Sequence, residues 1–568
     1  MPLKKLLLKP GVNRENTRYT NEGGWYDCDK VRFRQGTPEK IGGWQRISSQ
    51  TFLGVCRSLN NWVTLGGSNL IGLGTNLKFY VEEGGGYNDI TPLRATVTLT
   101  NPVTTSSGSS IVVIADAAGG YANGDFVTFS GASAVGGLTV DGDYQITYTG
   151  GTTYTIDAGS PAASTATGGG TVTAAYQVNV GPAVVVPFVG WGAGTWNAGT
   201  WGVGASADDS LRIWSQATFG EDLIYGPRGG QIYYWDATGG VTTRGVLLSS
   251  LAGASDVPTH QNLILTSDIS RFVFAFGANE YGSATVDPML IRWSDQEDAT
   301  NWTATNQAGF LRLSSGSEIV AALQSRQEVL VWTNAALYSL QYQGAPIVWG
   351  AQLVGENISI AGQNAVTYAN GVSYWMGKDK FYMYDGRVQS LRCDLRQYIF
   401  GDLNTGQYEQ VVAGTNEGFN EIWWFYCAAN SSQNDRYVIY NYREDVWYFG
   451  NLGRTAWLDS GLRNFPLAAT YAGNLVDHES GVDDQITDSP VPIAAYITSS
   501  EFDLDDGHQF AFVWRVLPDM TFRGSTATSP SATMTLLPLK NAGSGYNTPA
   551  SVGGSNSAGI TRTATLPI

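Results

Sequence analysis

Four carboxylates in the second half of the chain have the residue type that acid–base catalysis needs: Asp379, Asp385, Glu421 and Asp445. A glycoside hydrolase needs two such groups that face each other across a cleft. No motif in the sequence pairs any two of them, so they would form a site only if the fold brought them together. We therefore expect no catalytic residues and predict that the protein is not an enzyme.

The sequence has few residues that could bind a metal or a cofactor or act as an activated nucleophile. Acidic runs at 476–484 and 503–507 could offer oxygen ligands to Ca²⁺, but neither has the spacing of a calcium loop, and acidic turn residues are the favoured interpretation. The three histidines, His260, His478 and His508, lie in no G-x-S-x-G setting, and the chain has no C-x-x-C pair. We expect neither a metal nor a cofactor.

The composition narrows the protein class. The chain has 568 residues, with 70 Gly, 18 Trp, 29 Tyr and 21 Phe, only 14% charged residues and a net charge of -16. This composition excludes a coiled coil, which is rich in Ala, Glu, Lys and Leu, and the acidic balance excludes an electrostatic nucleic-acid binder. A hydrophobic content of 43% is enough for a sizeable core. A large β protein rich in turns and aromatic residues remains.

A recurring aromatic-rich hairpin organises most of the chain. Each copy has two alternating strands around a Gly, Asn or Asp turn, as hairpins require. Copies start at Leu70, Leu223, Phe272, Val329, Val372 and Glu421, and the last five starts are separated by 49, 57, 43 and 49 residues. This spacing is close to the roughly 40–50 residues of a propeller blade. We predict an all-β fold, a β-propeller of about six blades, with five or seven left open.

The first two hairpins lie too far apart for one blade, and a change of composition explains the excess. From about 95 to 180 the chain is rich in Thr, Ser, Gly, Val and Ala and alternates with period two. We interpret this segment as a small β domain inserted between blades. The expected domains are an N-terminal arm with the first propeller strands (1–94), the insertion (95–180), the remaining blades (181–488), and a C-terminal β extension with a Gly/Ser-rich tail (489–568).

Three tryptophans stand five residues apart in a glycine-rich stretch, GWGAGTWNAGTWG: Trp191, Trp196 and Trp201. This spacing fits neither a helix stripe nor one face of a strand. The stretch is either a partner-binding patch, since Trp is favoured at interfaces, or a plug that folds back onto the propeller.

Targeting signals are missing from the sequence. The apolar run near the start is three leucines long, shorter than a secretory signal requires, and no stretch approaches a membrane span. Four scattered cysteines do not form a disulfide framework. We expect a protein that folds in a reducing cytoplasm and has no membrane span.

Several stretches together resemble the tail nozzle, or packaged-DNA-stabilisation, family of short-tailed bacteriophages. They are GGWYDCDKVRFRQGTPEKIGGWQR from Gly23, IRWSDQEDATNW from Ile291, LVWTNAALYSLQY from Leu330, SYWMGKDKFYMYDGRV from Ser373, the long EIWWFYCAANSSQNDRYVIYNYREDVWYFG from Glu421, and the later FDLDDG and VLPD. Together they cover the propeller and its C-terminal extension. The 95–180 insertion does not carry the resemblance and looks like a mobile β module of phage structural proteins.

The resemblance implies a structural protein of the virion tail, assembled in the host cytoplasm. Typically six copies form a tube below the portal and its adaptor ring, which retains the packaged DNA and conducts it during ejection. The implied partners are other copies of the chain, the portal-adaptor protein, and tail fibre or other tail proteins, with DNA as a passenger. Trp191, Trp196 and Trp201 become candidates for the gate. Lys4 and Lys5, in the N-terminal arm, either dock on the adaptor or belong to an ordinary disordered terminus.

An acidic lumen suits this role, because it repels phosphates and lets DNA slide without sticking. Two other functions stay open. A glycan- or receptor-binding propeller of a virion would use exposed aromatic side chains to stack on sugars, and a propeller glycoside hydrolase would need facing carboxylates. The mass and symmetry of the purified assembly separate the conduit from both.

Overall fold

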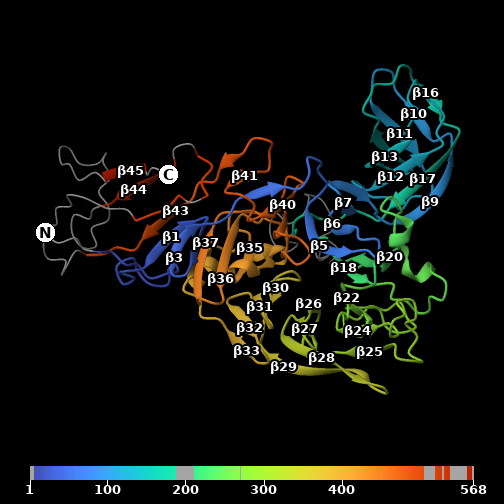
Figure 1. Cartoon of the computed structure of the whole chain (residues 1–568). Helices are drawn as coiled ribbons and strands as arrows, with labels where there is room; N and C mark the ends of the chain where they lie inside the picture. Colours follow the sequence, from blue (N-terminus) through green and yellow to red (C-terminus); the bar gives the residue numbers. More distant parts are fainter. Residues whose placement is uncertain are drawn as a thin grey trace, which may run out of the picture.

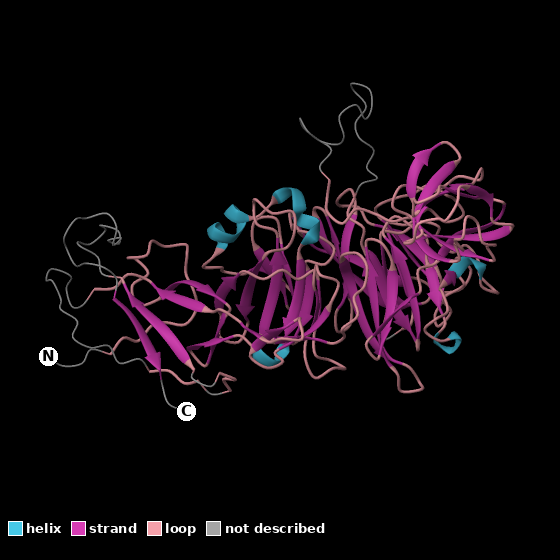
Figure 2. Ribbon diagram, turned by 90° about the horizontal axis from the view of Figure 1, so that it is seen from above, coloured by secondary structure: helices cyan, strands magenta, loops and turns pink. Residues whose placement is uncertain are grey.

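The computed structural model describes residues 5–186, 210–268, 270–503, 519–522, 524–527, 530–537 and 560–565. Strands dominate it, and helical turns are few and short (Figure 2). Within the described ranges one α-helix is present, α1 (Arg396–Asp402), with the 3-10 turns η2 (Ala237–Gly239), η3 (Leu248–Ser250), η4 (Thr405–Gln410) and η5 (Glu417–Phe419). The fold is essentially all β, as predicted.

Six four-stranded antiparallel sheets follow one another along the chain, each hydrogen-bonded in sequence order. We number them as blades 1 to 6. Blades 1 to 3 are β5 (Cys56–Val63), β6 (Asn69–Thr75), β7 (Phe79–Glu83) and β8 (Gly86–Asp89); β18 (Trp214–Phe219), β19 (Asp222–Pro227), β20 (Tyr233–Trp235) and β21 (Val246–Leu247); and β22 (Leu263–Thr266), β23 (Val273–Phe276), β24 (Leu290–Trp293) and β25 (Gly309–Arg312). Blades 4 to 6 are β26 (Ile319–Gln324), β27 (Val329–Thr333), β28 (Ala336–Gly344) and β29 (Val348–Glu356); β30 (Val366–Ala369), β31 (Val372–Met376), β32 (Phe381–Tyr384) and β33 (Val388–Ser390); and β34 (Val412–Asn416), β35 (Glu421–Tyr426), β36 (Arg436–Asn441) and β37 (Val446–Gly450).

A seventh blade closes the ring, and both ends of the propeller sequence build it. Its sheet has the order β38 (Ala456–Leu458), β39 (Leu467–Ala469), β40 (Leu475–His478), β4 (Trp44–Arg46), β41 (Asp483–Gln485) and β42 (Val491–Pro492). The first strands of successive blades lie against one another, and β38 lies against β5 (Figure 1). The chain is therefore a seven-bladed β-propeller, closed by an N-terminal strand inserted next to β40.

The blade count is one more than the expected six, for a visible reason. The six aromatic-rich hairpins of the sequence are the second and third strands of blades 1 to 6. The equivalent hairpin of blade 7, β39–β40, has strands of three and four residues and no aromatic run. Because blades were counted by their aromatic-rich hairpins, the count missed this blade.

Aromatic side chains fill the spaces between blades. The rings of Trp332 and Trp375 join blades 4 and 5, with centroids 5.3 Å apart, and those of Trp423 and Trp457 join blades 6 and 7 at 5.4 Å. Glycine makes this approach possible: a Cβ at Gly414 would lie 2.1 Å from the Trp457 ring. Where a large flat ring packs against a glycine of the neighbouring strand, the two sheets can lie close together.

The segment between blades 1 and 2 forms two further sheets with a core of their own. One has the order β13 (Gly142–Gln145), β12 (Phe126–Ser130), β17 (Thr171–Gln177), β9 (Leu93–Thr100); the other has the order β14 (Thr147–Gly150), β15 (Thr153–Asp157), β11 (Ile111–Ala115), β10 (Val103–Thr105), β16 (Ala166–Gly168). Buried aliphatic and tyrosine side chains lie between the sheets. We call residues 93–177 the inserted domain; the sequence placed it at 95–180.

A charged network holds the base of the inserted domain on the propeller. Lys78, in the turn before β7, pairs with Asp89 at 2.9 Å and also with Asp143 of the inserted domain. Arg244 of blade 2 pairs with the same Asp89 at 3.2 Å. The Lys78 ammonium lies 4.4 Å from the centre of the Phe126 ring. Charged contacts therefore help to set the orientation of this domain.

The N-terminal strands before β4 run back over blade 6. The hairpin of β2 (Val31–Arg34) and β3 (Thr37–Lys40) lies beside β37. The preceding β1 (Trp25–Asp29) pairs with β43 (Tyr496–Ser499), and β44 (Ser531–Leu536) pairs with β45 (Ile560–Thr565). These terminal strands lie at the opposite end of the molecule from the inserted domain (Figure 1). No helix in the described residues is long and apolar enough to cross a membrane.

Candidate functional site

Polar contacts link blades that are not neighbours at one end of the propeller axis, and we call these contacts the axial cap. Arg57, on β5 of blade 1, donates from Nη2 to Oε1 of Gln410 (2.6 Å), and Gln410 directly precedes blade 6. Asn364, directly before blade 5, donates to the carbonyl oxygen of Arg57 at 2.8 Å. These bonds join blade 1 to the connections that lead into blades 5 and 6.

The turn η4 is the centre of this axial cap. It lies in the connection between blades 5 and 6, and its Glu409 accepts from Arg228 of blade 2 at 2.6 Å. Its Gln407 exchanges two hydrogen bonds with the backbone of Val185, at 3.0 and 2.7 Å. One connection therefore contacts blades 1 and 2 and the chain that follows the inserted domain.

The guanidinium of Arg57 is buried at this cap without an acidic partner. Its second Nη2 contact is the carbonyl oxygen of Ala183 at 3.0 Å, and no carboxylate of the described chain contacts it. Burial lowers the pKa of Arg57 below its ordinary value. Burying a cation that is bound only by neutral oxygens costs free energy of folding. This end of the axis is therefore a polar site inside the fold.

The tryptophan-rich stretch is attached at the same place. Trp191, Trp196 and Trp201 lie outside the described residues. The chain enters the stretch after Val185, bound to Gln407, and leaves it before Leu211, whose carbonyl oxygen accepts from Arg228 at 2.7 Å. Both attachment points thus contact η4 or its partner Arg228. Of the two candidate lysines of the N-terminal arm, Lys4 is outside the described residues and Lys5 is exposed.

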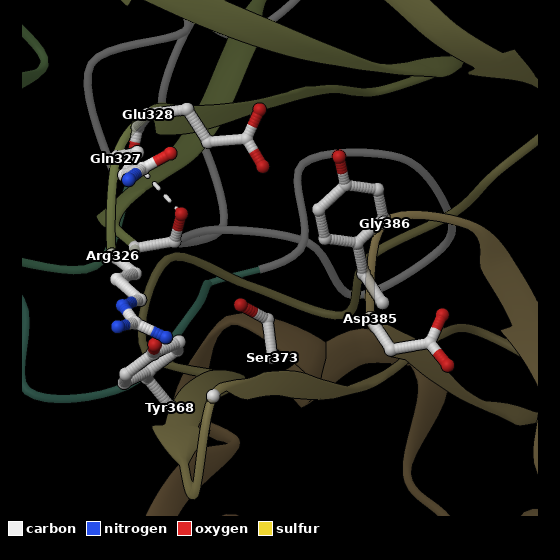
Figure 3. Close-up of a pocket in the computed structure, with 10 residues that line it drawn as sticks. Arg326, Gln327, Glu328, Tyr368, Ser373, Asp385 and Gly386 are labelled. Atoms are coloured by element: carbon white, nitrogen blue, oxygen red, sulfur yellow. Dashed lines mark hydrogen bonds between the residues drawn. The ribbon is translucent and has the colours of Figure 1, made fainter.

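A second polar feature is a pocket of about 250 Å³ between blades 4 and 5, at the end of the ring where the turns between first and second strands lie (Figure 3). It is lined by Ser325, Arg326, Gln327, Glu328, Tyr368, Gly371, Ser373, Tyr384, Asp385 and Gly386. Glu328 accepts from Ser339 of β28, and burial, followed by the Glu328 charge, raises the pKa of Tyr384 to about 12. The pocket can bind a small polar group.

The pocket does not have the geometry of a glycoside hydrolase. Asp385 turns its carboxylate towards its own loop, where it accepts from the backbone N–H of Arg387 at 3.2 Å, and points away from Glu328 (Figure 3). Asp379 and Asp385 lie at opposite ends of β32, and Asp379 pairs with Arg396 at 3.4 Å. Asp445 accepts from the hydroxyl of Tyr440 at 2.9 Å. The fold therefore does not bring these candidate carboxylates together.

The fourth candidate, Glu421, is fully committed to a buried ion pair. Arg32, on β2, donates to its two carboxylate oxygens at 2.9 and 3.0 Å and to those of Glu479 at 2.8 and 2.6 Å. Tyr448 and Trp423 donate to Glu421 at 2.5 and 3.0 Å. This ionic hub joins the N-terminal hairpin to blades 6 and 7, and its role is structural.

The described histidines and the acidic run at 476–484 have polar partners; 504–507 of the second acidic run lie outside the described residues. His478 is buried in blade 7, where its Nε2 accepts from Nε of Arg454 at 2.9 Å, and burial, with the Arg454 charge, holds its pKa well below the ordinary value. His260 lies beside the carbonyl oxygen of Gly277 at 3.2 Å. In the 476–484 run, Asp477 pairs with Arg463. No group of metal-ligating side chains occurs within the described part of the chain, and His508 lies outside it.

Sequence reasoning missed Arg32 and Arg57. Arg32 alternates with buried Val31 and Phe33 on a strand of which three residues in succession are buried. Period two predicts that it faces solvent, and only the Glu421 and Glu479 carboxylates, about 390 and 450 residues away, make its burial possible. No local signal could have identified it.

The closed ring of seven blades, six of them four-stranded, defines this chain as a β-propeller protein. No family model matches the chain, and no curated protein matches it. Similar solved structures include the crystal structure of Kluyvelomyces marxianus Hsv2, a β-propeller, with a TM-score of 0.29 and 9% identity over 48% of this chain and 73% of that chain. A second similar structure, KlHsv2 with loop 6CD replaced by a Gly-Ser linker, has a TM-score of 0.26 and 11% identity over 45% of this chain and 74% of that chain.

Proposed function

We propose that this protein is the structural subunit of a bacteriophage tail nozzle, an oligomeric tube that retains packaged DNA and conducts it during ejection. The observation that carries the proposal is the ordered set of stretches that resemble this family. They fall on the N-terminal strands β1 to β4, the last of which closes the ring, and on β24, β27, β28, β31 to β33 and β35 to β37 of blades 3 to 6.

The axial cap adds a constraint to this proposal. Because hydrogen bonds of Arg57, Gln410 and Asn364 cross one end of the propeller axis, the proposal puts the DNA passage of such a tube between subunits and not through a propeller. A conduit of this kind needs several copies, typically six, each contributing its propeller to the wall. The net charge of -16 per chain supplies a surface that repels phosphates instead of replacing their counterions.

The attachment of the tryptophan-rich stretch next to the cap supports its candidacy for the gate. The described residues on either side of the stretch, Val185 and Leu211, are both fixed by hydrogen bonds next to the cap. The portal-adaptor protein above, and tail fibre or other tail proteins around it, are the remaining partners, and the virion tail is the location.

The mass of the purified full-length chain tests the proposal. Light scattering at several protein concentrations should give six times 60.9 kDa, the mass of one chain. A monomer at every concentration, or a monomer that hydrolyses polysaccharide, would reject the conduit.

One observation favours a second candidate, a glycan-binding propeller of a virion. Tyr281 and Phe310 of blade 3 stack with ring centroids 5.8 Å apart, and they are 39% and 50% exposed. Exposed rings of this kind can stack on sugars. A glycan array distinguishes the two: binding that is lost in Phe310→Ala, by a chain that stays monomeric, would favour this alternative.

A further inference from the structure

Blade 4 carries an arm that no other blade has. Its outer strands β28 and β29 have nine residues each, whereas the corresponding strands of the other four-stranded blades have two to six. They stay paired out to Gly344 and Val348, so the end of the hairpin runs beyond the sheet, beneath β25 of blade 3 (Figure 1). We call residues 341–350 the arm.

The arm is held rigidly at its base. Tyr342 and Trp349 face each other across the hairpin with ring centroids 5.4 Å apart. Both pack on Phe272 of blade 3 at 5.8 Å, and Trp349 packs on Phe274 at 4.9 Å. Because four aromatic rings fix the hairpin, a partner that binds its tip loses little conformational entropy in doing so.

The tip is apolar, exposed and uncharged. Ile347 is 60% exposed and Tyr342 45%, and Ala345 and Pro346 between them are also exposed. From 329 to 355 the chain has no charged residue, in a protein with a net charge of -16. Two copies of so acidic a chain repel each other over most of their surface, so a neutral protrusion is where they can touch without that cost.

A groove that could receive such a tip lies at the other end of the same strand. It has a volume of about 530 Å³ and is lined by Val354, Gly355, Glu356, Asn357, Ile358, Lys380, Tyr382, Gly386, Arg387, Val388 and Ser390. The arm includes the first residues of β29 and the groove includes its last three, so the tip and the groove are roughly 25 Å apart on the rim of each copy. In Figure 1 the arm points away from β33, which lines the groove.

We infer that the arm of one copy docks in the groove between blades 4 and 5 of a second copy. A protrusion and a hollow at different places on one chain make a head-to-tail contact, and such contacts form a ring when the rotation between neighbouring copies closes. The tip is a small contact, so it acts as the anchoring point of a larger subunit interface. This inference rests on the proposed function, for which it specifies the surface that joins neighbouring subunits.

Sedimentation velocity of four full-length chains tests the inference: the wild type, Ile347→Asp in the arm, Ser390→Trp in the groove, and Leu65→Asp as control. Leu65, in the turn after β5, is 91% exposed and apolar, so its substitution adds the same charge away from the arm. We expect the arm and groove variants to assemble at least tenfold more weakly than the wild type. The control should assemble as strongly as the wild type. A mixture of the arm and groove variants should form 1:1 dimers, since one intact arm meets one intact groove.

Assembly of Ile347→Asp or Ser390→Trp at wild-type strength, or a mixture that stays monomeric, would overturn the docking while leaving the conduit intact. A wild type that is monomeric at all concentrations would overturn both. A second measurement does not depend on destabilising the contact. In an Ile347→Cys/Ser390→Cys chain, oxidation should give a ladder of cross-linked copies, and the absence of a ladder in an assembled ring would contradict the docking. The four natural cysteines are buried and do not interfere.

Discussion

The propeller ring and the inserted domain are both all β, but different forces hold them together. In the ring, indole and phenyl rings pack between blades, as in the pairs Trp332–Trp375 and Trp423–Trp457. The inserted domain has a core of aliphatic and tyrosine side chains between two sheets, and it joins the ring through the ions around Lys78. The difference indicates that the ring is one cooperative structure to which the inserted domain is attached as a separate unit.

Removing an aromatic ring between blades should have the largest effect. Trp423→Ala deletes the stacking on Trp457 and one donor to Glu421, and we expect a loss of about 3–5 kcal/mol in the free energy of unfolding of the ring. Tyr154→Ala, in the core of the inserted domain, should lower only the transition of that domain. Urea unfolding followed by tryptophan fluorescence and by circular dichroism measures both. Equal effects of the two variants on one shared transition would contradict the separation.

Breaking the ionic hub of Arg32, Glu421 and Glu479 should have the second largest effect on stability. Arg32→Met leaves Glu421 and Glu479 buried without their cation, which costs about 3–5 kcal/mol. Arg34→Met is the matched control on the same strand, because Arg34 is exposed and its pair with Glu39 contributes about 0–1 kcal/mol. Denaturant midpoints of the two variants give the comparison, and similar values would show that the hub does not close the ring.

Acid should weaken blade 7 through His478. Its folded-state pKa is held well below 6.5 by burial, so below pH 6.5 the unfolded chain takes up a proton that the folded chain refuses. Stability is therefore present above this pH and is lost as the pH falls, by about 2 kcal/mol between pH 7 and 5. His478→Gln should remove that part of the pH dependence in urea titrations at both pH values. An unchanged pH dependence in His478→Gln would mean that folding does not shift the pKa of His478.

Excision of the inserted domain should have the smallest effect on the ring. Leu93 pairs directly with Gln177, so the two ends of the excised segment meet and a short Gly-Ser linker in place of residues 94–176 can join them. We expect the free energy of unfolding of the ring, obtained from urea titrations, to stay within about 0.5 kcal/mol of that of the intact protein, as for changes away from the core. A chain that no longer folds after excision would show that the inserted domain is part of the propeller.

The sequence predicted those parts of the fold that local pattern determines. Six of the blades were visible because their second and third strands alternate aromatic and small residues around short turns. Blade 7 was not counted, because its strands are short and one of them, β4, comes from residues 44–46, more than 400 residues before its neighbours. Strand insertion over that distance has no local signal.

The candidate site shows the same limit. The tryptophan-rich stretch could be identified from its composition, whereas the axial cap depends on Arg57 and Gln410, which are about 350 residues apart in the sequence. Likewise the residue types of Glu421 and Asp385 suggested catalysis, and only the fold reveals that one is bound to Arg32 and the other turns to its own loop. Side-chain chemistry can be listed from a sequence, but which groups meet is decided by the closure of the ring.

Electron cryomicroscopy of the purified full-length assembly tests the central claim most directly. The account predicts a six-fold tube whose lumen lies between the propellers, with more Asp and Glu than Lys and Arg along its wall and with the axis of each propeller closed at the cap. A monomer, or a ring with a strongly basic lumen, would contradict it.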